Sequence, residues 1–463
     1  MKKTILLTIL FVSICTFASA QESTVANILI EKSINFSPVS ILRGILGMGV
    51  IILVCWLFSA DRKAINWGTV GKALALQFLI AVSLLLFPAV QSVFEMLGGL
   101  FISVLSWTKA GSDFLFGSLM DTSKTGYIFV FQILPTIIFF SALMSLFFYL
   151  GIIQKVVWVM GWGLAKIIKL SGAEALSCAG NVFVGMTEAP LAVKEYVPKM
   201  TKSELMLIMT SGMATMSGGV LAAYIGMLGG GDPALEMEFA KHLLSASIMA
   251  APGAVALSKI IMPQREEVDN TLHISEGKLG KNPLDAIANG TAEGLRLAAN
   301  VAAMLLVFYA LIAGTNAILG WLSFPAMDTW IEKISGGRYT DLSLQAILAF
   351  VFYPIIWLTG VPSEDIGIVG RLFGEKLILT EFVGYQSMAQ LLHQGAFSCP
   401  KSAVMAAYVL CGFANFASVG ILIGGVGGIA PNKKHILTKY GFHALLASSL
   451  VALMSAAMIG MFM

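Results

Sequence analysis

The chain has 463 residues, of which 57% are hydrophobic and 12% charged, and its mean hydropathy is +0.85. This composition excludes a string of soluble domains and indicates a protein that crosses a membrane many times. The net charge of +3 is too small to favour a nucleic-acid partner, and the five cysteines include no C-x-x-C pair, so neither a disulfide framework nor a zinc site is predicted.

Residues 1–20 have the three parts of a secretory signal peptide. A start of Met-Lys-Lys is followed by an apolar run over 5–17 and by Ala18-Ser19-Ala20, which is typical of a cleavage site. The apolar run is shorter than the ~20 residues that a spanning helix needs, so cleavage is favoured over an uncleaved first span.

The region 38–150 is predicted to hold the N-terminal spans. Spanning helices are expected over 38–60, 74–90 and 127–150, and the glycine-interrupted stretch over 94–122 is expected at the outer interface. Basic residues follow the first span, so the positive-inside rule places that loop in the cytoplasm.

The region 151–262 has a distinctive order of segments. We expect an interfacial helix over 154–170, a re-entrant hairpin over 173–197, a broken span over 205–228 and a span over 242–262. The hairpin has two apolar arms, each too short to cross alone, around Asn181 and Thr187-Glu188. The polar run Thr215-Met216-Ser217 should unwind the broken span, although Gly218-Gly219 could instead serve close helix packing.

The same order returns after the region 263–322, which holds a charged cytoplasmic loop, an amphipathic lead-in and another span. Within 342–463 we expect an interfacial helix over 342–358, a hairpin over 367–394 around Thr380-Glu381, a broken span over 403–426 and a final span over 444–462. The predicted fold is therefore an all-α polytopic membrane protein with eight transmembrane helices and two re-entrant hairpins.

The two copies are predicted to form an inverted repeat. An odd number of crossings separates them, so one hairpin should enter from the cytoplasm and the other from outside. Inverted repeats with paired discontinuous helices are typical of secondary transporters, whose site lies where the two breaks meet near the midplane.

Two acids mark this site. A carboxylate inside a bilayer costs at least ~2.5 kcal/mol, so Glu188 and Glu381 are candidate functional residues. Either one could be a protonated structural acid, but two acids, each after a Thr and each before a broken span, argue against that interpretation.

The polar side chains available at the two hairpins and breaks predict a neutral ligand. Thr187, Glu188, Glu381, Asn415 and Ser418 offer carboxylates, an amide and hydroxyls, and no Arg or Lys is expected within these cores. Sugars and nucleosides fit, because a vicinal diol can donate two charge-assisted hydrogen bonds to one carboxylate. A coupling Na⁺ would need oxygen ligands, for which Asn181 and Thr215 are candidates, although Asn181 could equally cap the hairpin tip.

Three motifs carry a family resemblance. The segments 185–191 (Gly-Met-Thr-Glu-Ala-Pro-Leu), 379–383 (Leu-Thr-Glu-Phe-Val) and 411–416 (Cys-Gly-Phe-Ala-Asn-Phe) resemble the signatures of the concentrative nucleoside transporter family. The similarity runs from about Leu42 to the C-terminus. It implies a homotrimer of eight-span protomers in the bacterial inner membrane, each with a scaffold and a mobile transport domain, that takes up nucleosides with Na⁺ and needs no other cofactor.

The resemblance also assigns residue roles. It places Met186, Thr187, Glu188 and Val220 at the nucleobase and Glu381, Asn415 and Ser418 at the ribose. It also implies a Na⁺ site formed by the side chains of Asn181 and Thr215 and the backbone carbonyls of Val184 and Met216. Met186 stands where many members carry Gln, and because a thioether packs against a large ring but donates no hydrogen bond, purine nucleosides are favoured.

Several alternatives stay open at this point. The coupling ion could be H⁺, although the motif of the proton-coupled branch is absent, and specificity could be for pyrimidines or broad. A membrane-embedded enzyme could use Glu188 and Glu381 as acid and base, but the sequence offers no nucleophile or metal motif for it. A channel would leave the hairpins without a purpose.

Overall fold

The computed structural model describes residues 37–126, 128–269, 271–272 and 280–463. Over these residues the chain forms helices and no strand, which confirms the all-α prediction. The signal peptide predicted over 1–20 lies outside the described residues.

Eight helical segments in the described ranges are long and apolar enough to cross a membrane. They are 38–57, 67–86, 88–120, 129–149, 202–229, 233–261, 283–322 and 431–460. This set differs from the predicted one at two places. The stretch predicted at the outer interface belongs to a continuous 29-residue helix, α4 (Pro88–Phe116). The second broken span, whose two helices have 11 and 14 residues, is not in the set.

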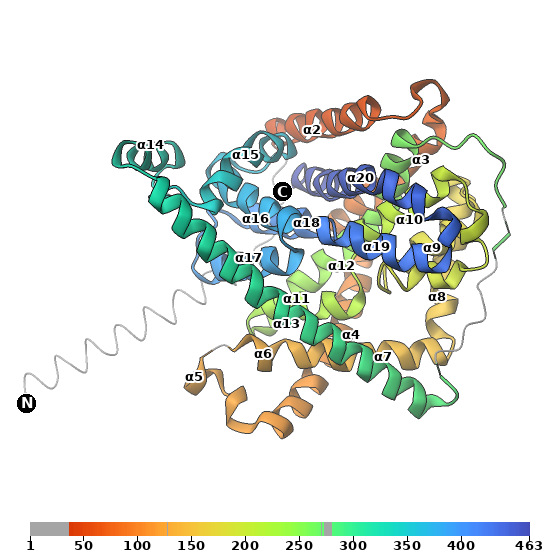
Figure 1. The fold of residues 1–463 in the computed structure, drawn as a ribbon, viewed down its shortest axis with the longest axis horizontal. Helices are drawn as coiled ribbons and strands as arrows, with labels where there is room; N and C mark the ends of the chain where they lie inside the picture. Colours follow the sequence, from red (N-terminus) through yellow and green to blue (C-terminus); the bar gives the residue numbers. More distant parts are fainter. Residues whose placement is uncertain (1–36, 127, 270, 273–279) are drawn as a thin grey trace, which may run out of the picture.

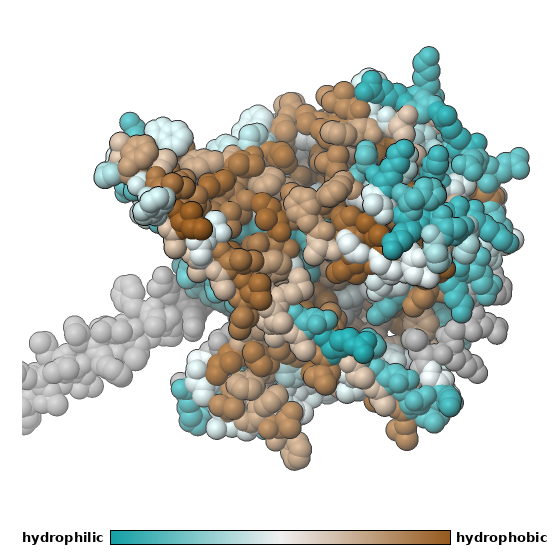
Figure 2. All heavy atoms as spheres, in the orientation of Figure 1, coloured by the Kyte–Doolittle hydropathy of each residue, from teal (hydrophilic) through white to brown (hydrophobic). Residues whose placement is uncertain are grey.

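An outer group of helices surrounds the two repeats (Figure 1). Besides α4, its long members are α2 (Pro38–Leu57), α3 (Trp67–Leu86), α7 (Leu134–Tyr149) and α13 (Pro283–Leu322), with the short α14 (Pro325–Ser335) after α13. The amphipathic lead-in and span expected after the cytoplasmic loop form one 40-residue helix, α13. Figure 2 shows a broad apolar surface on the face that α13 crosses, as expected of a surface that contacts lipid.

Close packing holds α13 against α7. A Cβ at Gly290 would lie 2.6 Å from the Ser145 side chain, and one at Gly294 would lie 2.8 Å from the Ile138 backbone. Gly290 and Gly294 are four positions apart, so both face the same neighbour. Small residues at this spacing let helix backbones approach closely inside a membrane.

The predicted repeat order is present in the structure. The first copy contains α8 (Ile152–Ile168), α9 (Gly172–Gly180), α10 (Lys202–Ala214), α11 (Gly218–Gly229) and α12 (Pro233–Ile261). The second copy contains α15 (Leu344–Thr359), α16 (Ile366–Ile378), α17 (Glu381–His393), α18 (Pro400–Leu410), α19 (Phe416–Ile429) and α20 (Lys434–Gly460). Both broken spans are interrupted where the sequence predicted, between α10 and α11 and between α18 and α19.

The two hairpins differ in their second arms. In the second hairpin both arms, α16 and α17, are α-helical. In the first hairpin the arm after the tip consists of turns and two short 3₁₀ helices, Ala189–Val193 and Val197–Lys199. Pro190 and Pro198 lie in these 3₁₀ helices, and because proline lacks a backbone donor they oppose a continuous α-helix.

Helices of the first copy pack against helices of the second. α10 packs against α20 as well as α12, and α18 packs against α12 as well as α20. α11 of the first copy also packs against α17 of the second hairpin. In the segments 202–229, 233–261 and 431–460, 89%, 94% and 83% of the residues in the most apolar stretch are buried. In the outer spans this share is only 17% to 33%. The repeats therefore form one interlocked core.

Candidate functional site at the junction of two broken helices

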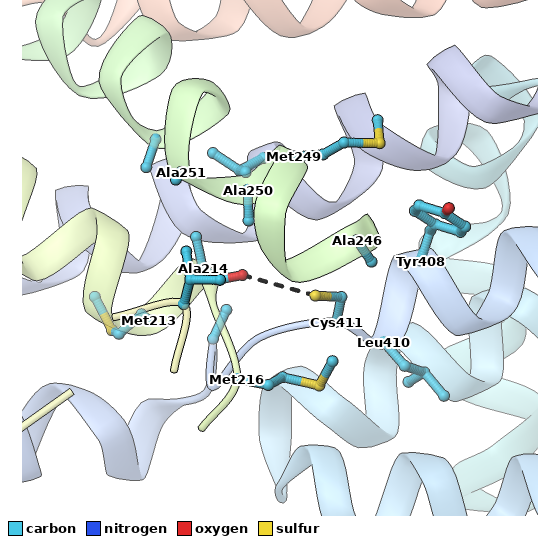
Figure 3. Close-up of a cluster of buried hydrophobic side chains, with 14 of the residues drawn as sticks. Met213, Ala214, Met216, Ala246, Met249, Ala250, Ala251, Tyr408, Leu410 and Cys411 are labelled. Carbon is cyan, nitrogen blue, oxygen red and sulfur yellow. Dashed lines mark hydrogen bonds between the residues drawn. The ribbon is translucent and has the colours of Figure 1, made fainter. Parts of the chain in front are cut away.

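The breaks of the two broken spans meet inside this core. The Sγ of Cys411, which caps α18, lies 3.9 Å from the carbonyl oxygen of Ala214, the last residue of α10 (Figure 3). Gly412 makes this approach possible, because its φ of +89° favours glycine and a Cβ there would collide with the Ala214 carbonyl. The meeting of the two breaks is the arrangement predicted from the repeat.

The second hairpin and the second break together build a polar cluster. Glu381 begins α17 at the hairpin tip, directly after Thr380, whose hydroxyl caps the helix. Asn415 caps α19 in the same way, because its Oδ1 accepts a hydrogen bond from the Ser418 backbone nitrogen at 2.8 Å. The Nδ2 of Asn415 donates to Oε2 of Glu381 at 2.8 Å. The structure therefore brings together the side chains of Glu381 and Asn415, with the backbone of Ser418 bonded to Asn415.

A residue that the sequence did not single out completes this cluster. Tyr224 of α11 is fully buried, and its hydroxyl donates to Oε1 of Glu381 at 3.2 Å. Glu381 is 5% exposed, so each carboxylate oxygen has one protein donor and little access to bulk water. A carboxylate offers about four acceptor positions, so Glu381 retains the capacity to accept ligand hydroxyls.

The first hairpin places its tip residues against different neighbours. Met186 packs over Gly212 of α10, and the Thr187 side chain packs over Gly425 of α19. Glu188 is exposed, and its Oε2 accepts a hydrogen bond from the Gly185 backbone nitrogen at 3.2 Å. Within the described part of the chain, no hydrogen bond or ion pair joins Glu188 to Glu381, so in this arrangement the two acids do not act as a pair.

A small cavity lies beside Glu188 and is lined by Gln154 and Val184 as well. Gln154 of α8 donates from Nε2 to the Phe148 carbonyl at 2.7 Å, while its Oε1 is buried without a protein partner. Val220, the fourth residue assigned to the nucleobase, is buried in α11 just after the first break. The lining of this cavity is mostly apolar, with the amide of Gln154 and the carboxylate of Glu188 at its edge.

The residues assigned to Na⁺ gather at the first break. Asn181 is 1% exposed and donates from Nδ2 to the Ser211 hydroxyl at 3.0 Å, while its Oδ1 has no protein partner. The Thr215 hydroxyl donates to the Ser211 carbonyl at 2.8 Å and keeps its own lone pairs. A buried oxygen without a donor suits a hard cation, which prefers oxygen ligands. Asn181 is also the C-cap residue of α9, so both of its predicted roles are compatible with the structure.

Backbone contacts hold the hairpin tip over this break. The Gly218 backbone nitrogen donates to the Phe183 carbonyl at 3.0 Å, and the Met216 nitrogen lies 3.5 Å from the Ser247 hydroxyl. A Cβ at Gly218 would lie 2.7 Å from the Phe140 ring, so this glycine serves close packing and also begins the helix after the break. Val184 and Met216, whose carbonyls were assigned to Na⁺, are both buried here.

One expectation about charge is wrong. No Lys or Arg was expected within these cores, but Lys376 of α16 is completely buried beside the second break, and Lys259 of α12 is buried in an ion pair with Glu174. An apolar run follows Lys376, and a lysine at such a position usually lies at the membrane surface. The fold instead turns the lysine inward, because backbone carbonyls at the end of α18 accept its hydrogen bonds.

Interlocked inverted repeats, each with a hairpin and a discontinuous helix that present polar groups to one buried junction, define a secondary transporter. Comparison with known proteins agrees with this class. The chain matches the family descriptions "Na+ dependent nucleoside transporter N-terminus" over 46–119, "Nucleoside recognition" over 130–231 and "Na+ dependent nucleoside transporter C-terminus" over 242–460.

Individual relatives cover nearly the whole chain. Nucleoside permease NupC of Helicobacter pylori is 36% identical over 91% of this chain and 98% of its own length. Sodium/nucleoside cotransporter 1 of Rattus norvegicus is 36% identical over 89% of this chain and 62% of its own length. The solved structure of CNTnw in an inward-facing substrate-bound state superposes with a TM-score of 0.81 at 36% identity, covering 91% of this chain and 98% of that one.

The chain therefore belongs to the concentrative nucleoside transporter family, and the family models that match its two ends are described as Na⁺-dependent. It is a multi-pass membrane transporter and not an enzyme, because the relatives that cover 89–91% of the chain are transporters. The alternative of a membrane-embedded hydrolase is thereby set aside.

Proposed function

We propose that this protein imports nucleosides, with a preference for purine nucleosides, by symport with Na⁺ across a bacterial inner membrane. The observation that carries the proposal is the Glu381–Asn415 hydrogen bond of 2.8 Å at the junction of the breaks. It fixes a buried carboxylate with unused acceptor positions, which is the chemistry that binds a ribose diol. A ligand lacking those hydroxyls would leave buried polar groups unpaired, at a cost of roughly 1–3 kcal/mol.

The Na⁺ site of this proposal is formed by Asn181, Thr215, Val184 and Met216. The unpartnered Oδ1 of Asn181 supports it, because a cation would supply the missing interaction. The nucleobase site of this proposal is formed by Met186, Thr187, Glu188 and Val220. The thioether of Met186 supports a purine preference, because it offers contact area and polarizability to a large ring and no hydrogen-bond donor.

We assign 38–150 and 263–322 to a scaffold and 151–262 and 342–463 to a mobile transport domain. The contrast in burial between the repeats and the outer spans supports this division. The outer helices expose large apolar side chains such as Leu306 and Trp321, at 73% and 84%, which suits contact with lipid and with neighbouring protomers of a homotrimer. The mass of the detergent-solubilised protein, measured by light scattering, tests the trimer.

Uptake into proteoliposomes tests the function directly. Radiolabelled adenosine and uridine are supplied with an inward Na⁺ gradient, an inward proton gradient or no gradient. Accumulation of adenosine above uridine with the Na⁺ gradient alone is the expected result. Accumulation with only the proton gradient would overturn the coupling ion, and equal accumulation of the two nucleosides would overturn the purine preference. No accumulation by folded, inserted protein would overturn the proposed substrate class.

A further inference from the structure

Lys376 is a buried cation that the proposed transport cycle does not use. Its side chain in α16 is 0% exposed, and its Nζ donates to the carbonyl oxygens of Cys411 at 2.6 Å and Val409 at 3.1 Å. None of the ion pairs found among the described residues includes Lys376. The buried Lys259, in contrast, pairs with Glu174.

The partners of Lys376 explain how the charge is tolerated. Val409 and Cys411 lie at the C-terminal end of α18, where the last carbonyls of a helix have no intrahelical donor. The same end carries the negative pole of the helix dipole, equivalent to roughly half an elementary charge, and this pole stabilises a cation. The ammonium of Lys376 thus neutralises the end of α18 in the place of a free cation.

The corresponding place in the first repeat is built differently. The residue that caps α10 is Thr215, as Cys411 caps α18, and the first hairpin lays Asn181 over that helix end. Asn181 contributes a neutral amide whose oxygen has no protein partner. Among the residues that the structure describes, no lysine donates a hydrogen bond to the end of α10. The first repeat therefore leaves room for a cation at its break, whereas the second repeat places the ammonium of Lys376 there.

We propose that the ammonium of Lys376 is a built-in cation that takes, at the second break, the place that the coupling Na⁺ takes at the first. The second repeat then binds no ion, and the protein transports a single Na⁺ with each nucleoside. This inference rests on the proposed Na⁺ symport and adds the distribution of the cations between the repeats.

Lys376 acts as a positioning residue and does not touch the ligand, because it is enclosed on all sides. It fixes the carbonyl of Cys411, from which the chain turns through Gly412 to Asn415. Asn415 in turn donates to Glu381. The fixed charge thereby holds the ribose cluster in place throughout the cycle, whereas the first break is completed only when Na⁺ arrives.

The test compares K376M and K376R with the unaltered protein in proteoliposomes. The unaltered protein should show a Na⁺ dependence of uptake with a Hill slope of about one and about one charge moved per adenosine. K376M should lose at least about tenfold in uptake at moderate Na⁺, because charge-assisted hydrogen bonds are lost. High Na⁺ should restore part of that uptake with a slope rising toward about two, because an ion can now occupy the vacated place. K376R keeps the charge and should keep the slope of about one.

The control is K401M, at the other end of α18. Lys401 is half-buried and donates to the Ser40 hydroxyl at 2.9 Å, far along α18 from the break, so its loss should leave the Na⁺ dependence unchanged. Reduced uptake by K376M with an unchanged slope and an unchanged half-saturating Na⁺ concentration would show a merely structural lysine. A charge-to-adenosine ratio of about two in the unaltered protein would overturn the inference even if K376M does not fold. Uptake without any Na⁺ dependence would instead overturn the proposed symport itself.

Discussion

The hydroxyl of Tyr224 donates a hydrogen bond to Oε1 of Glu381 at 3.2 Å, and this bond joins the first repeat to the second. The Tyr224 ring stacks on Tyr385 with centroids 4.0 Å apart and meets the edge of Phe382 at 4.9 Å. Asn415 holds the other carboxylate oxygen. The carboxylate is therefore oriented from both repeats before a ligand arrives, which lowers the entropy cost of binding.

Replacing Glu381 by Gln should remove nucleoside uptake. The amide has the size of the carboxylate but loses its negative charge and one acceptor oxygen, and two charge-assisted hydrogen bonds to ribose hydroxyls are worth roughly 1.5–3 kcal/mol each. We expect uptake at low adenosine to fall by at least about 100-fold. Size-exclusion profile and thermal stability should stay close to those of the unaltered protein. Normal uptake by E381Q would remove the ribose role of this residue.

Replacing Tyr224 by Phe should weaken nucleoside binding without abolishing transport. The substitution keeps the stacked ring and removes one donor to Glu381, so the KM for adenosine should rise by about 5- to 30-fold while the maximal rate changes little. The control is Y385F, because the Tyr385 hydroxyl donates to the Ala407 carbonyl at 2.9 Å and not to Glu381. An equal rise of KM in both variants would mean that Tyr224 acts through packing alone.

The sequence predicted the parts of this site that depend on local pattern. The broken spans follow from polar and glycine runs inside apolar segments, and Glu381, Asn415 and Ser418 each sit at a helix start that their own motif defines. Tyr224 could not be predicted, because its role depends on a residue 157 positions away in the chain. Ser211 was missed for a similar reason, since it joins Asn181 to Thr215 only after the hairpin folds over α10.

The first hairpin was predicted to have two apolar arms, and the structure shows that the second of them consists of turns and 3₁₀ helices. Apolar length alone does not distinguish an α-helix from turns, whereas Pro190 and Pro198 each remove a backbone donor. The burial of Lys376 was not expected, because a lysine at the edge of an apolar run is usually at the membrane surface. Its burial depends on carbonyls supplied by α18, which no local pattern reveals.

Replacing Thr215 by Val should weaken Na⁺ binding selectively. The substitution removes the hydroxyl that would face the ion and leaves a side chain of similar shape, so the half-saturating Na⁺ concentration should rise by about tenfold, as expected for a lost ligand worth roughly 1–2 kcal/mol. T215S keeps the hydroxyl and is the matched control, with a Na⁺ dependence close to that of the unaltered protein. If T215V and T215S need the same Na⁺ concentration, Thr215 is not an ion ligand.

Replacing Met186 by Gln should widen the range of nucleosides. Met186 lies at the first hairpin tip against Gly212, where it presents a flexible apolar thioether. A Gln there adds an amide that donates and accepts hydrogen bonds, which a pyrimidine edge can use and a thioether cannot supply. We expect uridine uptake relative to adenosine to rise by about five- to tenfold, corresponding to one added hydrogen bond of roughly 1 kcal/mol.

The control for this substitution is Met186→Leu, which keeps the apolar character and should keep the ratio of uridine to adenosine uptake. Measuring both nucleosides in the same vesicles separates selectivity from a general loss of activity, because the ratio does not depend on the amount of inserted protein. An unchanged ratio in M186Q would mean that the purine preference comes from another residue near the hairpin tip. The best placed is Gln154, whose Oε1 is buried without a protein partner in the cavity beside Glu188.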